Sequence, residues 1–168
     1  HVPNRALEVA VALHANEAVA WAEPNYLLNP IVCSTNDTYF DRQWNIDNTG
    51  SSAQGGGTPG ADMDVLNAWT ITTGSPDITV AVLDSGVDTL HEDLQGVLVP
   101  GFDGLGDGTN GYPTPNFDSD AHGTACAGII GAVADNNLGI AGVAHGVKIA
   151  PVRIFYYIDT IIGTLELN

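Results

Sequence analysis

The sequence predicts an α/β protein with a doubly wound, mostly parallel sheet, and three consecutive segments carry this prediction. Residues 78–86, ITVAVLDSG, form a near-continuous apolar run, which is typical of a central parallel strand buried on both faces. The segment of small and apolar residues that starts at His122 predicts a helix. Residues 147–155, VKIAPVRIF, predict a second strand. Strand, helix and strand in this order form the unit from which doubly wound sheets are built.

The other segments supply shorter elements and long loops. Residues 5–19 combine spaced apolar positions with alanines and predict a short amphipathic helix, and residues 19–30 are expected to be extended up to a proline. The polar residues 46–62 indicate a loop. Residues 64–74 predict a short helix closed by its last glycine. The Gly-, Pro- and Asp-rich residues 101–120 indicate a long loop, which in a compact domain is often functional.

Composition excludes some classes of partner. The 168 residues contain 20 acidic and 4 basic side chains, which argues against nucleic acid as a ligand. No apolar run approaches the length of a membrane span. The excess of carboxylates suits an extracellular protein or one that binds hard cations. The two cysteines, Cys33 and Cys126, are far apart and do not form a disulfide framework.

Two ionisable residues flank the strand–helix unit. Asp84 ends the first predicted strand, and functional groups of open α/β sheets gather at the carboxyl ends of strands. His122 starts the predicted helix and follows Asp118, Ser119 and Asp120, which are candidate helix caps. Taken singly, an aspartate in DSG fits a turn, and a histidine at a helix start fits an ordinary surface position. The surrounding sequence has to decide between these readings and a functional one.

That surrounding sequence resembles one family. Residues 78–94, ITVAVLDSGVDTLHEDL, and the segment HGTACAGIIGAVADNNLGIAGVAHGVKIAPVRIF at residues 122–155 resemble the aspartate and histidine segments of subtilisin-like serine proteases. The HGTACAG form is similar to the kexin and furin branch and its bacterial relatives. The segments NDTYFDRQWNIDNTG and ADMDVLNAWTITTG resemble the amino-terminal part of the same catalytic domain, and VAWAEPNYLL resembles the end of its inhibitory propeptide. The resemblance covers roughly residues 5–155, whereas the tail YYIDTIIGTLELN cannot be aligned.

The resemblance implies a domain organisation and a fold. Residues 1–33 are expected to be the carboxyl-terminal part of an inhibitory propeptide, and residues 34–168 the amino-terminal part of a peptidase domain. The fold is then a three-layer, subtilisin-like α/β sheet, truncated before its carboxyl-terminal part. A secreted zymogen is implied, with its own propeptide as intramolecular inhibitor and polypeptides as substrates.

The resemblance also implies catalytic roles for the two ionisable residues. His122 would be the general base of a serine endopeptidase, and Asp84 would orient the imidazole. The family's nucleophilic serine belongs to a GTS motif that these 168 residues do not contain, so the chain alone is expected not to hydrolyse peptide bonds. Small residues after His122 would let the helix approach the sheet closely. Cys126 is expected to be a packing residue, not a second nucleophile.

A calcium site is implied in the loop that follows the histidine helix. Oxygen ligands drawn from three segments suit Ca²⁺ better than zinc. The ligands carried over from the family are the side chains of Asp37, Asp93 and Asn136 and the backbone carbonyls of Val133, Leu138 and Ile140. An ordinary amide-rich turn is the alternative for the segment DNNLGIAG alone.

Two other functions remain as alternatives. The first is a non-catalytic module of the same fold that binds only peptide or calcium. The second is a transition-metal hydrolase using Asp84, Asp118, Asp120 and His122, which is disfavoured because the sequence has no H-x-x-x-H pair. The substrate-binding residues are not identified by the sequence. Ser85 stands where furin-like enzymes have a second aspartate, so specificity for basic substrates is not expected.

Overall fold

The computed structural model describes residues 3–22, 34–113, 121–158 and 164–167. The chain divides into two compact units, His1–Ile31 and Val32–Asn168. The first unit contains helix α1 (Pro3–His14), which starts and ends earlier than the predicted helix at residues 5–19. The large apolar side chains of Val9, Val11 and Leu13 in α1 are exposed.

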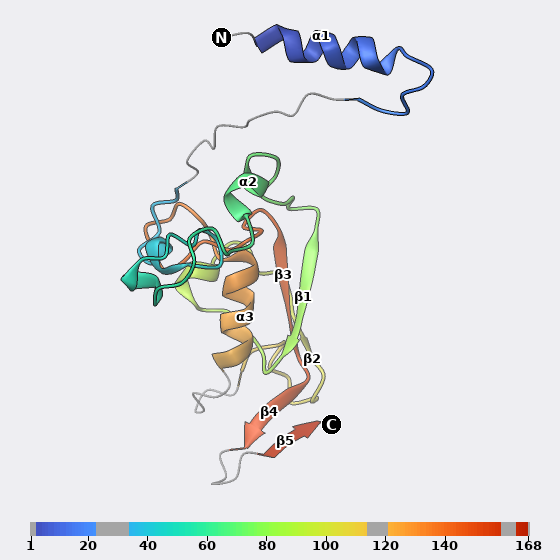
Figure 1. Cartoon of the computed structure of the whole chain (residues 1–168). Coiled ribbons are helices and arrows are strands. Elements are labelled where there is room, and N and C mark those ends of the chain that lie inside the picture. The colour runs from blue at the N-terminus through green and yellow to red at the C-terminus, as the bar shows by residue number, and fades with distance from the viewer. Residues whose placement is uncertain (1–2, 23–33, 114–120, 159–163, 168) are drawn as a thin grey trace. The chain divides into compact units, whose positions relative to one another are not determined.

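The second unit is built on a three-stranded parallel sheet (Figure 1). Its strands are β1 (Thr79–Asp84), β2 (Phe102–Asp103) and β3 (Lys148–Arg153), and their order is β1-β3-β2. The predicted strand–helix–strand unit is therefore confirmed. Strand β2 lies inside the segment that was predicted to be a loop, and its two residues are too few to produce a periodic pattern. Because the strands are parallel, their carboxyl ends meet at one edge of the sheet.

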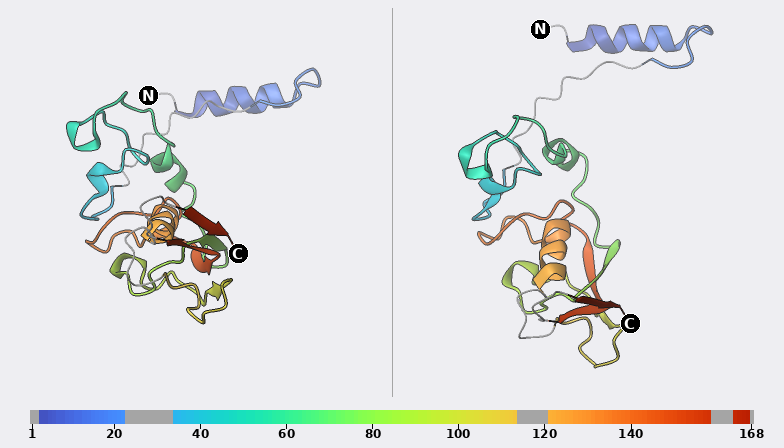
Figure 2. Two further views of the ribbon diagram at one scale, coloured as in Figure 1. Left: turned by 90° about the horizontal axis from the view of Figure 1, so that it is seen from below. Right: turned by 60° about the horizontal axis from the view of Figure 1, so that its bottom comes forward.

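Helix α3 (His122–Gly131) packs on one face of this sheet, as Figure 1 and the two views of Figure 2 show. The other face is open in the described residues, where the side chains of Leu83 and Phe102 are exposed. The described residues thus show two of the three layers that were expected. The main core lies between helix, sheet and the segment after β1 and contains Val82, Val87, Leu94, Val97, Ala127, Ala132, Val147 and Ile149.

A second, smaller core anchors helix α2 (Val65–Trp69). Trp69 packs there with Ile46, and its indole N–H donates a hydrogen bond to the carbonyl of Val143 at 2.8 Å. The helix is shorter than predicted, because it ends at Trp69 and turns follow. Gly74, the glycine predicted to close this helix, lies in the turns after it. Its φ is 102°, and a Cβ at this position would lie 2.8 Å from Val147 Cγ1, so only a glycine fits there.

Short elements complete the second unit. Three 3₁₀ helices span Phe40–Arg42, Ser52–Gln54 and Glu92–Leu94. Strands β4 (Phe155–Ile158) and β5 (Thr164–Leu167) form an antiparallel pair, which begins at the last residue of the resembling segment and continues into the tail that could not be aligned. None of the helices in the described ranges is long and apolar enough to cross a membrane.

Candidate active site and cation-binding loop

Asp84 is positioned by the turn that directly follows β1. Its Oδ1 accepts hydrogen bonds from the backbone N–H of Ser85 at 2.7 Å and from the hydroxyl of the same residue at 3.1 Å. Gly86 makes this turn possible, because its φ is 105° and a Cβ would lie 2.8 Å from the carbonyl oxygen of Gly111. The carboxylate is therefore held in one orientation at the carboxyl end of β1. This strand is buried on one face only in the described residues, not on both faces as the sequence predicted, because no described element covers the face that carries Leu83.

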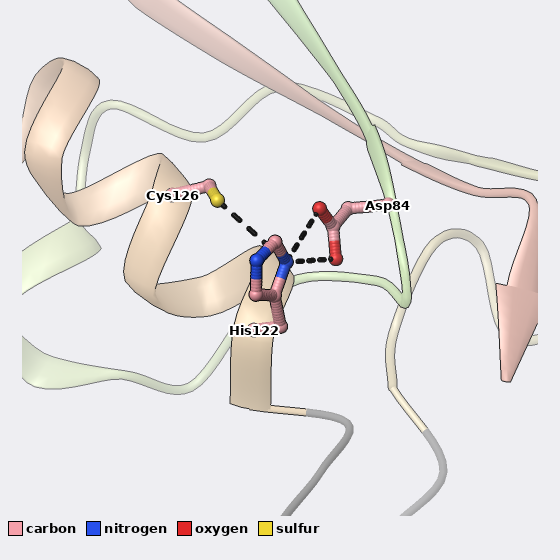
Figure 3. Close-up of side chains that lie close together, drawn as sticks. All are labelled: Asp84, His122 and Cys126. Carbon is pink, nitrogen blue, oxygen red and sulfur yellow. Dashed lines mark hydrogen bonds and ion pairs between the residues drawn. The ribbon is translucent and has the colours of Figure 1, made fainter. Parts of the chain in front are cut away.

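His122, the first residue of α3, faces this carboxylate (Figure 3). Its Nδ1 lies 2.9 Å from Asp84 Oδ1 and 2.8 Å from Oδ2. Since both neighbours are carboxylate oxygens, Nδ1 carries a proton, and in the neutral ring Nε2 is then the free acceptor. The side chain of His122 is 57% exposed and that of Asp84 is 12% exposed, so the pair is open to solvent on the histidine side.

The close approach of α3 to the sheet depends on small residues, as predicted. A Cβ at Gly123 would lie 2.9 Å from Asp84 Cβ and would also overlap the backbone oxygen of Gly86. The N–H of Gly123 donates a hydrogen bond to the Ser85 hydroxyl at 3.3 Å, and Thr124 Oγ1 accepts one from Asp88 N–H at 2.9 Å. These bonds tie the first turn of the helix to the turn that carries Asp84.

The residue at the helix cap differs from the candidates that the sequence suggested. Ala121 occupies the N-cap position of α3 and makes no side-chain capping hydrogen bond. Asp118, Ser119 and Asp120 lie outside the described residues. The transition-metal site proposed as an alternative would need two of these, so the structure describes only half of its ligands.

Cys126 lies beside the Asp84–His122 pair. Its Sγ is 3.7 Å from His122 Nδ1, and Figure 3 shows it on the other side of the imidazole from the carboxylate. Burial and the negative charge of Asp84 both raise the pKa of this thiol. A thiol held in its neutral form is a poor nucleophile, which agrees with the expectation of a packing role. The spacing of four residues on one helix face is the sequence signal for this contact.

The structure brings the six predicted calcium ligands together around the loop after α3. Asp37 accepts hydrogen bonds from the backbone N–H groups of Asp135 and Asn136 at 3.1 and 3.2 Å. Asp93 Oδ2 accepts one from the N–H of Ile140 at 2.8 Å, and its backbone oxygen accepts one from Val133 at 2.9 Å. The remaining predicted ligand, Leu138, donates its N–H to Asn136 Oδ1 and accepts a hydrogen bond from Thr38 N–H.

The donor set of this loop fits a hard cation. Asp37 and Asp93 are only 6% and 2% exposed, and within the described ranges neither carboxylate forms an ion pair with a basic side chain. Two buried carboxylates among amide and carbonyl oxygens are the chemistry that Ca²⁺ prefers. Asn136 now presents its amide nitrogen to Asp93 Oδ1 at 2.8 Å, so this amide would have to rotate to offer its oxygen to a cation.

His145 lies near the same loop and was not singled out by the sequence. Its ring contacts the indole of Trp69 edge-on, with 5.1 Å between the ring centroids. Burial lowers the pKa of His145, while the charges of Asp135 and Asp37 act in the opposite direction. No sequence motif marks this residue, because its environment is created by tertiary packing.

A buried arginine organises the loop beyond β2. Arg153 stands beside Asp84 and Asp103 in the sheet register, and its side chain is 3% exposed. Its Nη1 pairs with Asp107 Oδ2 at 2.6 Å and lies 3.4 Å from Thr109 Oγ1. The carboxylate of Asp107 therefore already has a cationic partner within the protein.

Comparison with known proteins now identifies the family. Residues 75–160, which contain both Asp84 and His122, match the subtilase (peptidase S8) family. The chain belongs to the subtilase family. Subtilases are serine proteases, so the strand–helix pair described above is part of a protease fold.

Known subtilases share sequence and fold with this chain. It is 37% identical over 130 residues to neuroendocrine convertase 2 of Bos taurus, covering 76% of this chain and 20% of that protein. It is 38% identical over 146 residues to a thermophilic serine proteinase of Bacillus sp. (strain AK1), and this match covers 86% of this chain and 31% of that protein. The structure of the serine protease of Aeromonas sobria, solved in complex with a chaperone, matches with a TM-score of 0.63 at 31% identity. This match covers 71% of this chain and 20% of that protein. The chain thus spans between a fifth and a third of these relatives' lengths.

Proposed function

We propose that this subtilase is a serine endopeptidase in which Asp84 and His122 are two members of an Asp–His–Ser triad. The observation that carries the proposal is the contact of His122 Nδ1 with both carboxylate oxygens of Asp84, at 2.9 and 2.8 Å. This contact fixes the tautomer in which Nε2 can accept a proton, and the exposed imidazole leaves that nitrogen accessible.

The proton transfers follow from this geometry. When a serine hydroxyl attacks a peptide carbonyl, His122 Nε2 would accept the hydroxyl proton and become an imidazolium. Asp84 stabilises that cation through the hydrogen bond at Nδ1 without taking its proton. Nε2 would then give the proton to the departing amine, so that the histidine returns to its starting state. In this proposal the serine is not one of the 168 residues, and the chain alone is inactive.

Calcium would have a structural part in this function. A cation bound by Asp37 and Asp93 would join the segment before the first 3₁₀ helix to the loop after α3, and so hold the carboxyl end of the histidine helix in place. The ion would take no part in the proton transfers, because its ligands lie at the far end of α3 from His122.

A secreted zymogen is the biological setting that we propose. The predicted propeptide boundary at residue 33 lies outside the described residues, and the inhibitory role of residues 1–33 stays a prediction. The excess of 20 acidic over 4 basic residues is compatible with an extracellular, calcium-containing environment.

An active-serine probe tests the proposal directly. The 168-residue chain should take up no fluorophosphonate label and should not hydrolyse casein, whereas the complete gene product should do both. Labelling of the 168-residue chain would overturn its proposed inactivity. A correctly folded complete gene product that neither reacts with the probe nor cleaves casein would favour the alternative, a subtilase fold that only binds peptide or calcium.

A further inference from the structure

Arg153 is a buried cation that stands beside Asp84 at the carboxyl edge of the parallel sheet. The two residues are partners in the register of β1 and β3, and the N–H of Ile154 donates a hydrogen bond to the backbone oxygen of Asp84 at 3.0 Å. Side chains alternate between the two faces of a strand, and both residues occupy buried positions, on the face that α3 covers. Arg153 and Asp84 are therefore neighbours on that face, although the proteolytic mechanism assigns no task to the arginine.

The guanidinium of Arg153 anchors the loop that follows β2. Its Nη1 donates a hydrogen bond to Asp107 Oδ2 at 2.6 Å and lies 3.4 Å from Thr109 Oγ1. The arginine side chain is 3% exposed and that of Asp107 is 50% exposed, so the pair joins the interior of the sheet edge to a surface loop. Because removing the partner of a buried charge is costly, the pairing fixes residues 107–109 against the sheet edge that carries Asp84.

The end of this loop packs against the turn that carries Asp84. The carbonyl oxygen of Gly111 accepts a hydrogen bond from the N–H of Val87 at 2.8 Å. A Cβ at Gly86 would lie 2.8 Å from the same carbonyl oxygen, so the loop end and the turn touch through their backbones. On its other side the turn meets Gly123, whose Cβ would overlap the backbone oxygen of Gly86. The turn is thus held between the loop end and the histidine helix.

We infer that Arg153 is a positioning residue for the catalytic pair. By anchoring Asp107 and Thr109, it holds the loop end that follows them against the turn after β1. This turn in turn sets the carboxylate of Asp84 against His122. A misplacement of about 1 Å that originates far from the reacting groups can cost about 10²-fold in rate. Loss of the anchor therefore lowers kcat and leaves KM unchanged, because KM depends on contacts with the substrate.

The effect of Arg153 on catalysis rests on the proposed function, but its effect on geometry can be measured without any reaction. In the neutral imidazole of His122, the carboxylate of Asp84 keeps the proton on Nδ1. Long-range ¹H–¹⁵N NMR spectra of the 168-residue chain distinguish this tautomer from the one that carries the proton on Nε2. A wild-type chain without the Nδ1–H tautomer would overturn both the triad and the role of Arg153. A tautomer that persists without the anchor would overturn the role of Arg153 alone.

Arg153→Met removes the anchor. In the 168-residue chain it should make the Nε2–H tautomer of His122 the major form, and in the complete gene product kcat should fall by about 10–100-fold with KM within about twofold of wild type. Arg153→Lys keeps a cation that can donate to Asp107, so its kcat should stay within about fivefold of wild type. Lys148→Met is the matched control, because it removes a cation from the opposite end of β3, where Nζ donates to the carbonyl of Gly96 at 2.6 Å. It should change neither the tautomer nor the kinetic constants.

Asp107→Ala breaks the anchor from its exposed side and keeps the test decisive if Arg153→Met does not fold. The half-exposed position leaves no buried cavity, and the charge of Arg153 is retained. The share of the Nδ1–H tautomer should decrease, and kcat should fall by about tenfold with KM unchanged. A folded Asp107→Ala protein with wild-type tautomer and wild-type kcat would overturn the anchoring role. A folded Arg153→Met protein with wild-type kcat would do the same, as would a loss that lies in KM alone.

Discussion

Asp84 contacts His122 Nδ1 with both of its carboxylate oxygens, at 2.9 and 2.8 Å, and the bond from Ser85 N–H holds that carboxylate in place. One side chain at the end of a strand thus orients another at the start of a helix, 38 residues further along the chain. A carboxylate can only accept a hydrogen bond, so it fixes the proton of the imidazole on Nδ1. A neutral amide of the same shape could instead donate its own N–H to Nδ1 and so favour the other tautomer.

Asp84→Asn tests this relationship in the complete gene product. The amide removes the charged acceptor at Nδ1 and favours the wrong histidine tautomer, so kcat for a peptide substrate should fall by about 10⁴-fold. Asp77→Asn makes the same change at an exposed position just before β1 and should leave kcat unaltered. A decrease of less than tenfold in Asp84→Asn would remove Asp84 from the catalytic group.

Gly123 allows α3 to approach the turn after β1, and its substitution tests the packing argument. In Gly123→Ala the new methyl would overlap the backbone of Gly86 and crowd Asp84, so unfolding free energy should fall by about 1–3 kcal/mol. Gly128→Ala is the matched control, since its Cβ would lie 3.6 Å from Ile140 Cδ1 in an ordinary contact. Relief of the glycine cost inside a helix should stabilise this control by roughly 0.5–1 kcal/mol.

Urea unfolding of the 168-residue chain measures both variants. Equal stabilities would show that the helix can move away from the sheet without cost. The position of His122 would then depend on something other than the close contact of Gly123 with the strand.

The elements predicted from the sequence are those with strong local patterns. The apolar runs of β1 and β3 and the small-residue helix between them are long enough to identify without tertiary information, and their order places Asp84 near His122. The small residues after His122 also predict the close approach of the helix to the sheet, and Gly123 lies where the helix meets the strand, a position that only a glycine fits.

Other features depend on contacts between distant segments. Strand β2 has two residues and is a strand only because β3 lies beside it. Helix α2 stops at Trp69, where that side chain joins the core with Ile46, although its sequence suggests a longer helix. The pairing of Arg153 with Asp107 joins segments 46 residues apart and leaves no local signature.

Calcium binding should stabilise the 168-residue chain through Asp37 and Asp93. At a calcium concentration 100-fold above Kd, linkage adds about 2.7 kcal/mol to the unfolding free energy. For a domain of this size that corresponds to a rise of roughly 5–10 °C in Tm. Asp93→Asn should abolish the rise, because it removes a buried carboxylate that faces the 133–140 loop.

Glu92→Gln is the matched control for the calcium experiment. It changes the same amount of charge at the neighbouring, exposed position, so its calcium-dependent rise in Tm should equal that of the wild type. Differential scanning calorimetry with and without calcium measures all three chains. A calcium-dependent rise that persists in Asp93→Asn would place the ion elsewhere.

Asp103 should make the order of the loop after β2 depend on pH. Desolvation alone would raise the pKa of Asp103, but the backbone N–H groups of Leu105, Thr109 and Gly108 donate hydrogen bonds to its carboxylate and lower the pKa to about 2. The unfolded value is about 3.9, so the folded loop favours the ionised form. Its stabilising effect is complete above about pH 4 and is lost as the pH falls towards 2.

Amide hydrogen exchange of Gly108 measures this effect, because its N–H donates to Asp103 Oδ2 at 2.6 Å. Protection, corrected for the intrinsic exchange rate at each pH, should be constant from pH 6 to pH 4 and should decrease below that. In Asp103→Asn the protection should already be low at pH 6 and should change little on acidification, since the amide cannot ionise. Asp77→Asn should behave like the wild type. Constant Gly108 protection down to pH 2 would show that the backbone turn and the Arg153–Asp107 pair hold the loop without the Asp103 charge.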